Sequence, residues 1–204
     1  DIQNLKEIGI DYLLIPEKND IENFSNPFDI KLEPKKITDD LCGKFRPGHF
    51  LAVIDIIHRF FQIIKPKNIL LGRKDYQQII VIKELIKIYN YNINIISADT
   101  VRNKDGLALS SRNNFLTKEE IKIASEIQSS LLLSKKLYDD KVSVNEITTK
   151  INELFLESSI NLEYFAIRDL NTLQHRNDND LIALIAVYLG KIRLIDNIII
   201  KSKP

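Results

Sequence analysis

The sequence has a single cysteine, Cys42, and neither methionine nor tryptophan. One cysteine cannot form a disulfide within the chain, and it excludes zinc sites that need several cysteines. Such sparing use of cysteine is typical of a reducing compartment, so we expect a cytoplasmic protein. Because the first residue is Asp1 and no methionine follows, we expect a further segment to precede this sequence in the natural protein.

Neither sign of charge predominates, and long hydrophobic runs are missing. Lys and Arg number 29 against 28 Asp and Glu, which gives a formal net charge of +1. Nucleic-acid-binding proteins usually carry a basic excess, so we expect no nucleic-acid partner, and an anionic ligand must be met by a local site. The apolar stretches are far shorter than the roughly 20 residues that a membrane span requires, so we expect no membrane partner either.

With 204 residues, of which 44% are hydrophobic, the chain can bury the core of one large domain or two small ones. In residues 1–100, short apolar runs alternate with periodic segments. We predict strands at 11–16 and, within a long polar excursion, at 28–34. A helix at 50–64, a strand at 68–72, a helix at 76–89 and a strand at 92–98 are predicted next. This alternation is typical of a parallel sheet with helical crossovers, as in a doubly wound α/β domain.

Residues 101–204 have a different pattern. Thr117 with Glu120, and Ser143 with Glu146, form capping boxes that open predicted helices at about 118–139 and 144–157. Three β-rich runs follow, and the last two meet at Gly190-Lys191, which predicts an antiparallel hairpin. The second half is therefore expected to be a small α+β domain.

The sharpest of three polar clusters is "LLGRKDYQQ", residues 70–78, where a buried strand ends and a helix begins. Gly72 allows the backbone to approach a ligand, Lys74 supplies a positive charge for a phosphate, and Asp75 is suited to ribose hydroxyls. Ligands of open α/β sheets bind at the carboxyl ends of the strands, where helix N-termini favour anions. A plain strand-to-helix turn with surface charges fits this spacing about as well.

The other two clusters favour ordinary structure when each is taken alone. "GKFRPGHF", residues 43–50, carries Arg46 and His49 before a helix, and is typical of a turn and a cap. "DGLALSSRNNFL", residues 105–116, is typical of a solvated loop, although its hydroxyls and guanidinium suit phosphate oxygens. Three such clusters at element junctions together favour a ligand site. Walker A and G-x-G-x-x-G patterns are missing, which disfavours P-loop NTPases and plain dinucleotide oxidoreductases.

Metal and thiol chemistry have little support. His58 and His175 have no ligand partner at metal spacing, so we expect no metal site built by protein side chains alone. Cys42 has no histidine near it in the sequence, so we do not expect a thiol nucleophile.

Four ordered motifs, "RPGHFLAVIDII", "LGRKDYQQ", "VRNKDGLALSSRNNFLT" and "LGKIRLIDN", closely resemble those of the pantothenate synthetase (pantoate:beta-alanine ligase) family. The resemblance implies a partial Rossmann-like nucleotide- and pantoate-binding domain at 1–100 and a small α+β lid domain with an antiparallel sheet at 101–204. It also implies ATP-dependent condensation of pantoate with beta-alanine through a pantoyl adenylate, releasing AMP and pyrophosphate. Mg²⁺ is expected with the triphosphate, and a homodimer is expected.

Site residues are carried over from the matching motifs. Lys74 is expected to be catalytic by stabilising the phosphates, and Gln78 to bind pantoate. The apolar wall of the pantoate site matches Val53, Ile56 and Ile57. The expected ATP-binding residues are Gly72, Arg73, Lys74, Asp75, Val101, Leu109, Ser110, Ser111 and Arg112.

The sequence also departs from the family. The His-x-Gly-His motif and the following Asn-Pro-x-Gln-Phe stretch do not occur, so we expect these 204 residues not to complete adenylation by themselves. Arg73, Leu109, Ala52 and Asp55 replace residues that are usual in the family, and Asp55 is expected to weaken binding of a carboxylate substrate. Two alternatives stay open, another nucleotidylyltransferase of the same superfamily and a nucleotide-binding remnant without catalytic activity.

Overall fold

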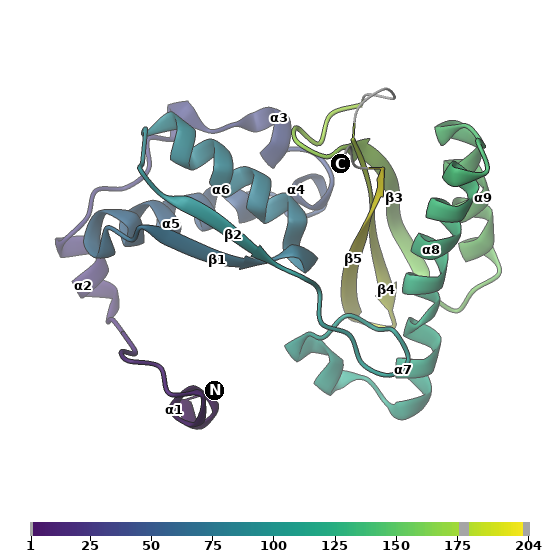
Figure 1. Cartoon of the computed structure of the whole chain (residues 1–204), viewed down its shortest axis with the longest axis horizontal. Coiled ribbons are helices and arrows are strands. Elements are labelled where there is room, and N and C mark those ends of the chain that lie inside the picture. The colour runs from purple at the N-terminus through teal and green to yellow at the C-terminus, as the bar shows by residue number, and fades with distance from the viewer. Residues whose placement is uncertain (1, 176–179, 202–204) are drawn as a thin grey trace.

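The computed structural model describes residues 2–175 and 180–201. Two sheets organise the chain, a parallel pair in the first half and an antiparallel group of three strands in the second (Figure 1). The elements, with η for 3-10 helices, are α1 (Ile2–Ile8), α2 (Lys18–Asn23), η1 (Ile30–Leu32), α3 (Lys35–Thr38), α4 (Cys42–Phe45), α5 (His49–Ile64), β1 (Asn68–Gly72), η2 (Arg73–Asp75), α6 (Tyr76–Ile88), β2 (Asn94–Ala98), η3 (Ser111–Phe115), α7 (Lys118–Ala124), α8 (Glu126–Asp139), α9 (Val144–Leu156), β3 (Asn161–Asp169), β4 (Leu181–Leu189) and β5 (Ile192–Lys201).

The parallel pair has the predicted order of elements. β1 and β2 run in register from Asn68 opposite Asn94 to Gly72 opposite Ala98, and α6 connects them. Helix α5 buries Ile54, His58 and Phe61, which recur at the spacing that places side chains on one face of a helix. The strands and crossover helix predicted between residues 50 and 98 are therefore confirmed.

Two strands predicted near the N-terminus are wrong. Residues 11–16 form no strand, and the apolar side chains of residues 12–15 are exposed, with Tyr12 at 94%. An apolar run becomes a strand only when a ladder partner satisfies its backbone, and β1 pairs with β2 alone among the described residues. Within 28–34, the side chain of Asp29 accepts the N–H of Lys31 and caps the short helix η1. This local hydrogen bond competes with extended structure.

The antiparallel sheet has the order β3-β4-β5, and β4 and β5 form the predicted hairpin. Helices α8 and α9 lie on one side of the sheet in Figure 1, and α6 lies on the other. Both predicted capping boxes are present, at the starts of α7 and α9. The single helix predicted at 118–139 is instead two helices, because Ser125 separates α7 from α8 and its hydroxyl donates to the carbonyl of Lys122 at 2.6 Å.

The two sheets share buried contacts. One apolar cluster contains Ile80 and Val81 of α6 together with Ile182 and Leu184 of β4. The hydroxyl of Tyr76 donates to the carbonyl of Leu170 at 3.0 Å, and burial raises the pKa of this tyrosine to about 12. A domain boundary near residue 100 stays a prediction, because side chains from both halves contribute to one core.

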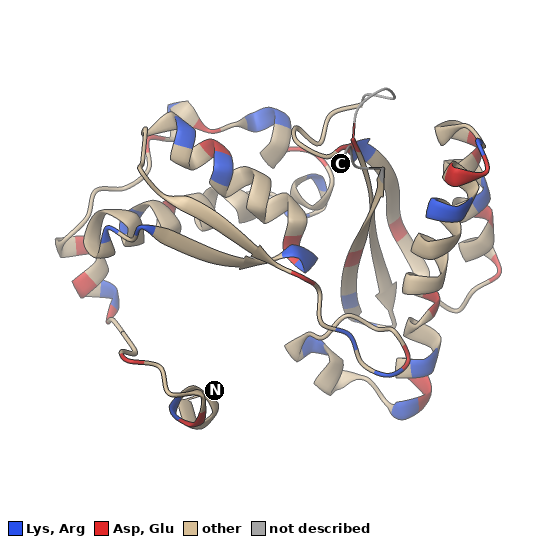
Figure 2. Ribbon diagram, viewed as in Figure 1, with Lys and Arg blue, Asp and Glu red and all other residues tan. Residues whose placement is uncertain are grey.

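Charged residues of both signs occur in both halves of the molecule (Figure 2). Among the residues that the structure describes, none of the helices has the length and apolar character needed to cross a membrane.

Candidate functional site

A pocket lies where three parts of the chain meet, the η2–α6 junction, the α4–α5 segment and the antiparallel sheet. Two of the three predicted polar clusters therefore contribute to one site. Its lining residues are Cys42, Arg46, His49, Phe50, Lys74, Asp75, Tyr76, Gln77, Gln78, Tyr164, Leu184, Ile185, Ile195, Asp196 and Asn197.

Lys74 and Asp75 lie at the carboxyl end of β1, immediately before α6. The side chain of Lys74 is only 16% exposed, and its Nζ atom is 4.0 Å from a carboxylate oxygen of Asp75. Gln78 follows on the first turn of α6 and lines the same pocket. A cation, a carboxylate and an amide at the start of a helix can bind an anionic group and hydroxyls together.

The part of the pocket wall formed by the α4–α5 segment carries His49 in a strongly positive environment. Arg46 Nη1 is 2.9 Å from His49 Nε2, so the guanidinium donates and this ring nitrogen accepts. Burial lowers the pKa of His49, and the charge of Arg46 lowers it further. Arg193 and Arg112 act in the same direction, whereas Asp75 opposes them. A neutral histidine among several guanidinium groups indicates a site suited to a multiply charged anion.

The backbone of this wall is held at close range. A Cβ atom on Gly43 would lie 1.6 Å from the carbonyl oxygen of Thr38, so this position requires glycine. The buried amide of Gln77 donates to the carbonyls of Ile37 and Asp40 at 2.7 and 2.8 Å and accepts the N–H of Cys42 at 3.0 Å. Helix α6 thereby fixes the segment that leads into "RPGH".

The sequence motifs missed a largely buried polar cluster in which Cys42 and Tyr164 line the pocket. Tyr164 Oη is 3.1 Å from Cys42 Sγ, and Arg193 Nη2 is 3.4 Å from the same sulfur. Arg193 also forms an ion pair with Glu163, and the two side chains are 13% and 8% exposed. Burial alone would lower the pKa of Arg193, but hydrogen bonds to Glu163 raise it above its ordinary value. Charged residues in the apolar runs of β3 and β5 were the signal available in the sequence.

The third predicted cluster lies beside the pocket and does not line it. Ser110 caps η3 by accepting the N–H of Arg112, and both Ser111 and Arg112 are exposed. The segment before this cluster is anchored to β5, because Arg102 forms a bidentate ion pair with the buried carboxylate of Asp196. Arg112 is close enough for its charge to affect His49.

Several predicted site residues lie outside the pocket lining. Arg73 forms an ion pair with Asp99, with Nη1 2.6 Å from Oδ1, and both residues line a separate surface pocket. Val101 and Leu109 are exposed. Among the described residues, the lining of the first pocket contains none of Gly72, Arg73, Val101, Leu109, Ser110, Ser111, Arg112, Val53, Ile56 and Ile57. Their binding roles stay predictions.

Asp55, the departure expected to weaken substrate binding, has structural partners. Its carboxylate accepts the N–H of Phe28 at 2.8 Å and the Nε–H of Arg59 at 2.9 Å. Burial raises the pKa of Asp55, but these two hydrogen bonds and the nearby charge of Arg59 together lower it overall. The carboxylate therefore anchors the segment that contains Phe28, and its effect on substrate binding stays a prediction.

Sequence comparisons place these features in a known family. The family described as "Pantoate-beta-alanine ligase" matches residues 1–199. The pantothenate synthetase of Coprothermobacter proteolyticus is 36% identical over 100% of this chain and 73% of that protein. The enzyme of Francisella tularensis subsp. novicida is 38% identical over 100% of this chain and 70% of its own length.

Solved structures agree with the sequence matches. A pantothenate synthetase from Thermus thermophilus has a TM-score of 0.89 and 29% identity over 99% of this chain and 75% of that chain. The ligase from Francisella tularensis, complexed with beta-gamma ATP and beta-alanine, has a TM-score of 0.73 and 38% identity over 100% of this chain and 70% of that chain. These likenesses confirm the Rossmann-like α/β fold class. The chain belongs to the pantoate-beta-alanine ligase family.

Proposed function

We propose that the pocket around Lys74 and His49 binds ATP and pantoate for the synthesis of pantothenate. The observation that carries this proposal is the convergence of "GRKDYQQ" and "RPGH" on one pocket, with Lys74, Arg46 and His49 among its lining. The membership of the chain in the ligase family supports the same reaction. The Francisella tularensis relative was solved with beta-gamma ATP and beta-alanine, which supports ATP and beta-alanine as substrates here.

The reaction requires no nucleophilic side chain. A carboxylate oxygen of pantoate attacks the α-phosphorus of ATP, and pyrophosphate leaves with the electron pair of the broken P–O bond. The amine of beta-alanine then attacks the carbonyl carbon of pantoyl adenylate, loses a proton and displaces AMP. Because the substrates supply the nucleophiles, the protein acts by positioning them and by stabilising the negative charge that develops on the phosphates.

Lys74 is proposed to stabilise that charge. Its side chain is mostly buried at the start of α6, where helix N–H groups also favour an anion. Asp75 is proposed to accept ribose hydroxyls, and Gln78 to hold pantoate. Ser110, Ser111 and Arg112 are proposed to approach the phosphates from the second half of the chain, and the effect of Arg112 on His49 supports their proximity.

Mg²⁺ is proposed to enter with the triphosphate. The described residues contain no cluster of three or more His, Cys, Asp or Glu side chains that could hold a metal ion. Asp75 is a carboxylate in the pocket, and Mg²⁺ is commonly bound by one or two carboxylates together with substrate phosphates. These residues fit a metal ion held largely by the nucleotide, which would neutralise phosphate charge when bound.

A homodimer and a cytoplasmic location are also part of the proposal. The family resemblance supports the homodimer, and the single cysteine supports a reducing compartment. Light scattering during size-exclusion chromatography measures the molar mass in solution. A mass of twice 23.6 kDa would support the dimer, and a mass of 23.6 kDa would contradict it for this chain.

The family's His-x-Gly-His motif does not occur in these 204 residues, so we do not expect them to complete the reaction by themselves. The proposed substrates are therefore tested by ligand binding. Thermal unfolding of the chain should be measured with ATP and Mg²⁺, with pantoate, and with both. We expect ATP to raise the melting temperature and pantoate to raise it further, since each ligand binds only the folded state. Protection by ATP without any effect of pantoate would favour a different nucleotidylyltransferase, and no protection by ATP would overturn the proposal.

A further inference from the structure

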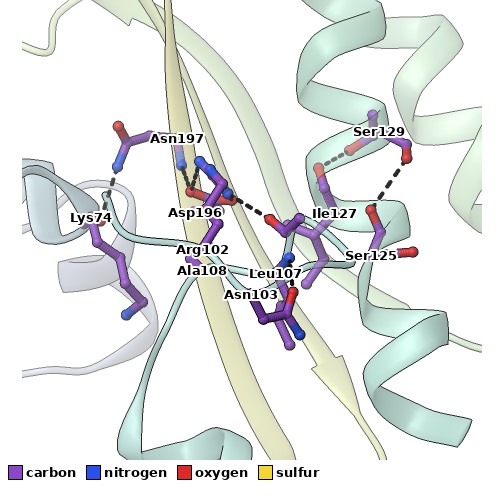
Figure 3. Close-up of polar contacts among 12 residues, drawn as sticks. Lys74, Arg102, Asn103, Leu107, Ala108, Ser125, Ile127, Ser129, Asp196 and Asn197 are labelled. Atoms are coloured by element: carbon purple, nitrogen blue, oxygen red, sulfur yellow. Dashed lines mark hydrogen bonds and ion pairs between the residues drawn. The ribbon is translucent and has the colours of Figure 1, made fainter. Parts of the chain in front are cut away.

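Two adjacent polar residues, Asp196 and Asn197, are buried within the apolar strand β5, with 4% and 6% of their surface exposed. The side-chain nitrogen of Asn197 donates to the carbonyl of Arg73 at 3.0 Å. It also donates to the carbonyl of Lys74 at 2.9 Å (Figure 3). A primary amide has two N–H donors, so both are used on successive carbonyls of one turn. Asn197 therefore contacts the backbone from which the Lys74 side chain extends.

Asp196, next to Asn197 on β5, holds the segment that leads to residues 110–112, the other residues predicted to bind the phosphates. Its carboxylate accepts two hydrogen bonds from Arg102 and one from the N–H of Asn197, the last at 2.8 Å. Arg102 also donates to the carbonyl of Gly106 at 3.1 Å. Figure 3 shows Arg102 reaching Asp196 beside Asn197. The segment that leads to Ser110 is thus tied to the strand that holds the turn of Lys74.

The backbone of β5 that carries these two residues is hydrogen-bonded within the antiparallel sheet. Asp196 pairs with Ile185 and Asn197 with Leu184 in the ladder between β5 and β4. Asn197 also borders both the pocket that contains Lys74 and the one that contains Arg73. A site is most accurately placed when its supporting groups are fixed by regular structure, and a buried amide in a sheet meets that condition.

We infer that Asn197 is a positioning residue, which acts through Lys74 by holding the η2 turn in the place where the ammonium group meets the triphosphate. The inference rests on the proposed function, since it takes Lys74 to contact ATP. Without the two N–H donors, the carbonyls of Arg73 and Lys74 lose their link to β5. The turn can then shift, and the charge of Lys74 is no longer placed on the phosphates.

The first test measures ATP affinity by calorimetry with Asn197→Ala and Asn197→Leu. Leucine branches at the same carbon as asparagine but has no N–H donor and no charge, so the second variant removes the contacts without leaving a cavity. We expect roughly tenfold weaker binding in both, the scale of one or two lost hydrogen bonds. Ile151→Val is the matched control, because Ile151 is buried in the other core and its small stability loss should leave ATP affinity unchanged.

The second test combines Asn197→Ala with Lys74→Ala. If Asn197 acts through Lys74, the double variant should bind ATP as weakly as Lys74→Ala alone. If the losses of ATP affinity in the two single variants multiply in the double variant, the inference is overturned while the proposed function stays intact. Folded Asn197 variants with unaltered ATP affinity would have the same consequence. Absence of ATP binding in the unaltered chain, or no effect of Lys74→Ala, would overturn the proposed function and this inference with it. Circular dichroism identifies folded variants, and the ATP affinity of Asn197→Leu is the test if Asn197→Ala does not fold.

Discussion

The buried ion pair between Glu163 on β3 and Arg193 on β5 offers a quantitative test of how the sheet is stabilised. Arg193 Nε lies 3.3 and 3.0 Å from the two carboxylate oxygens of Glu163, and a terminal nitrogen of the guanidinium donates to the same carboxylate. The two side chains are 8% and 13% exposed, so water screens the pair little. Glu163→Leu would leave the guanidinium buried without its counter-charge.

We expect Glu163→Leu to lower the free energy of unfolding by about 3–5 kcal/mol, the usual cost of breaking a buried pair. The double variant Glu163→Leu/Arg193→Met should lose much less, since apolar residues of similar volume often replace such pairs at little cost. Urea unfolding followed by circular dichroism at pH 7 gives each free energy by linear extrapolation. Glu22→Leu, which removes an exposed pair with Lys18, is the control and should change stability by at most about 1 kcal/mol.

A loss below about 1 kcal/mol in Glu163→Leu would contradict the prediction, because the pair would then behave as a solvated one. A double variant as unstable as the single one would also refute it, since the cost would come from lost packing. A changed slope of free energy against urea would indicate an altered unfolded or native state, so the comparison requires equal slopes.

Three further predictions concern stability. Gly43→Ala should cost about 1–3 kcal/mol or more in thermal unfolding, because its Cβ would lie 1.6 Å from the Thr38 carbonyl oxygen; a fully stable variant would contradict that geometry. Ser143→Ala should cost about 1 kcal/mol in urea unfolding, because the hydroxyl caps α9 by accepting the N–H of Glu146; an unchanged midpoint would count against the cap. Burial lowers the pKa of His58 below 6.5, so on lowering the pH the unfolded state takes up a proton before the folded state does. The free energy of unfolding should therefore fall as the pH drops below about 6.5. An equal fall in His58→Gln would exclude this histidine as the cause.

Elements governed by local hydrogen bonds could be predicted from the sequence. The capping boxes and the turn at Gly190 depend on residues a few positions apart, and the structure has them where the patterns indicate. The strand predicted at 11–16 depends instead on a ladder partner, which an apolar pattern cannot supply. The break at Ser125 was also missed, because helical periodicity continues through it.

The pocket was predictable to the extent that its residues adjoin element ends. Lys74 follows a strand, Arg46 precedes helix α5 and His49 begins it, so topology brings both groups to one edge. Asn197 and Glu163 act through contacts with residues more than 25 positions away, which no local pattern reveals. Their polarity within apolar strands was visible, but their partners depend on how the two sheets pack.

Lys74 is proposed to contact the phosphates of ATP, and calorimetric titration of the chain with ATP measures the effect of that contact. Three proteins should be compared, the unaltered chain, Lys74→Ala and Lys83→Ala. Lys83 is an exposed lysine of the same helix region, so its removal controls for the loss of one positive charge. We predict that Lys74→Ala weakens ATP binding roughly tenfold or more, the scale of a charge-assisted hydrogen bond, and that Lys83→Ala changes it little. Equal ATP affinity in Lys74→Ala and the unaltered chain would show that Lys74 does not contact the phosphates.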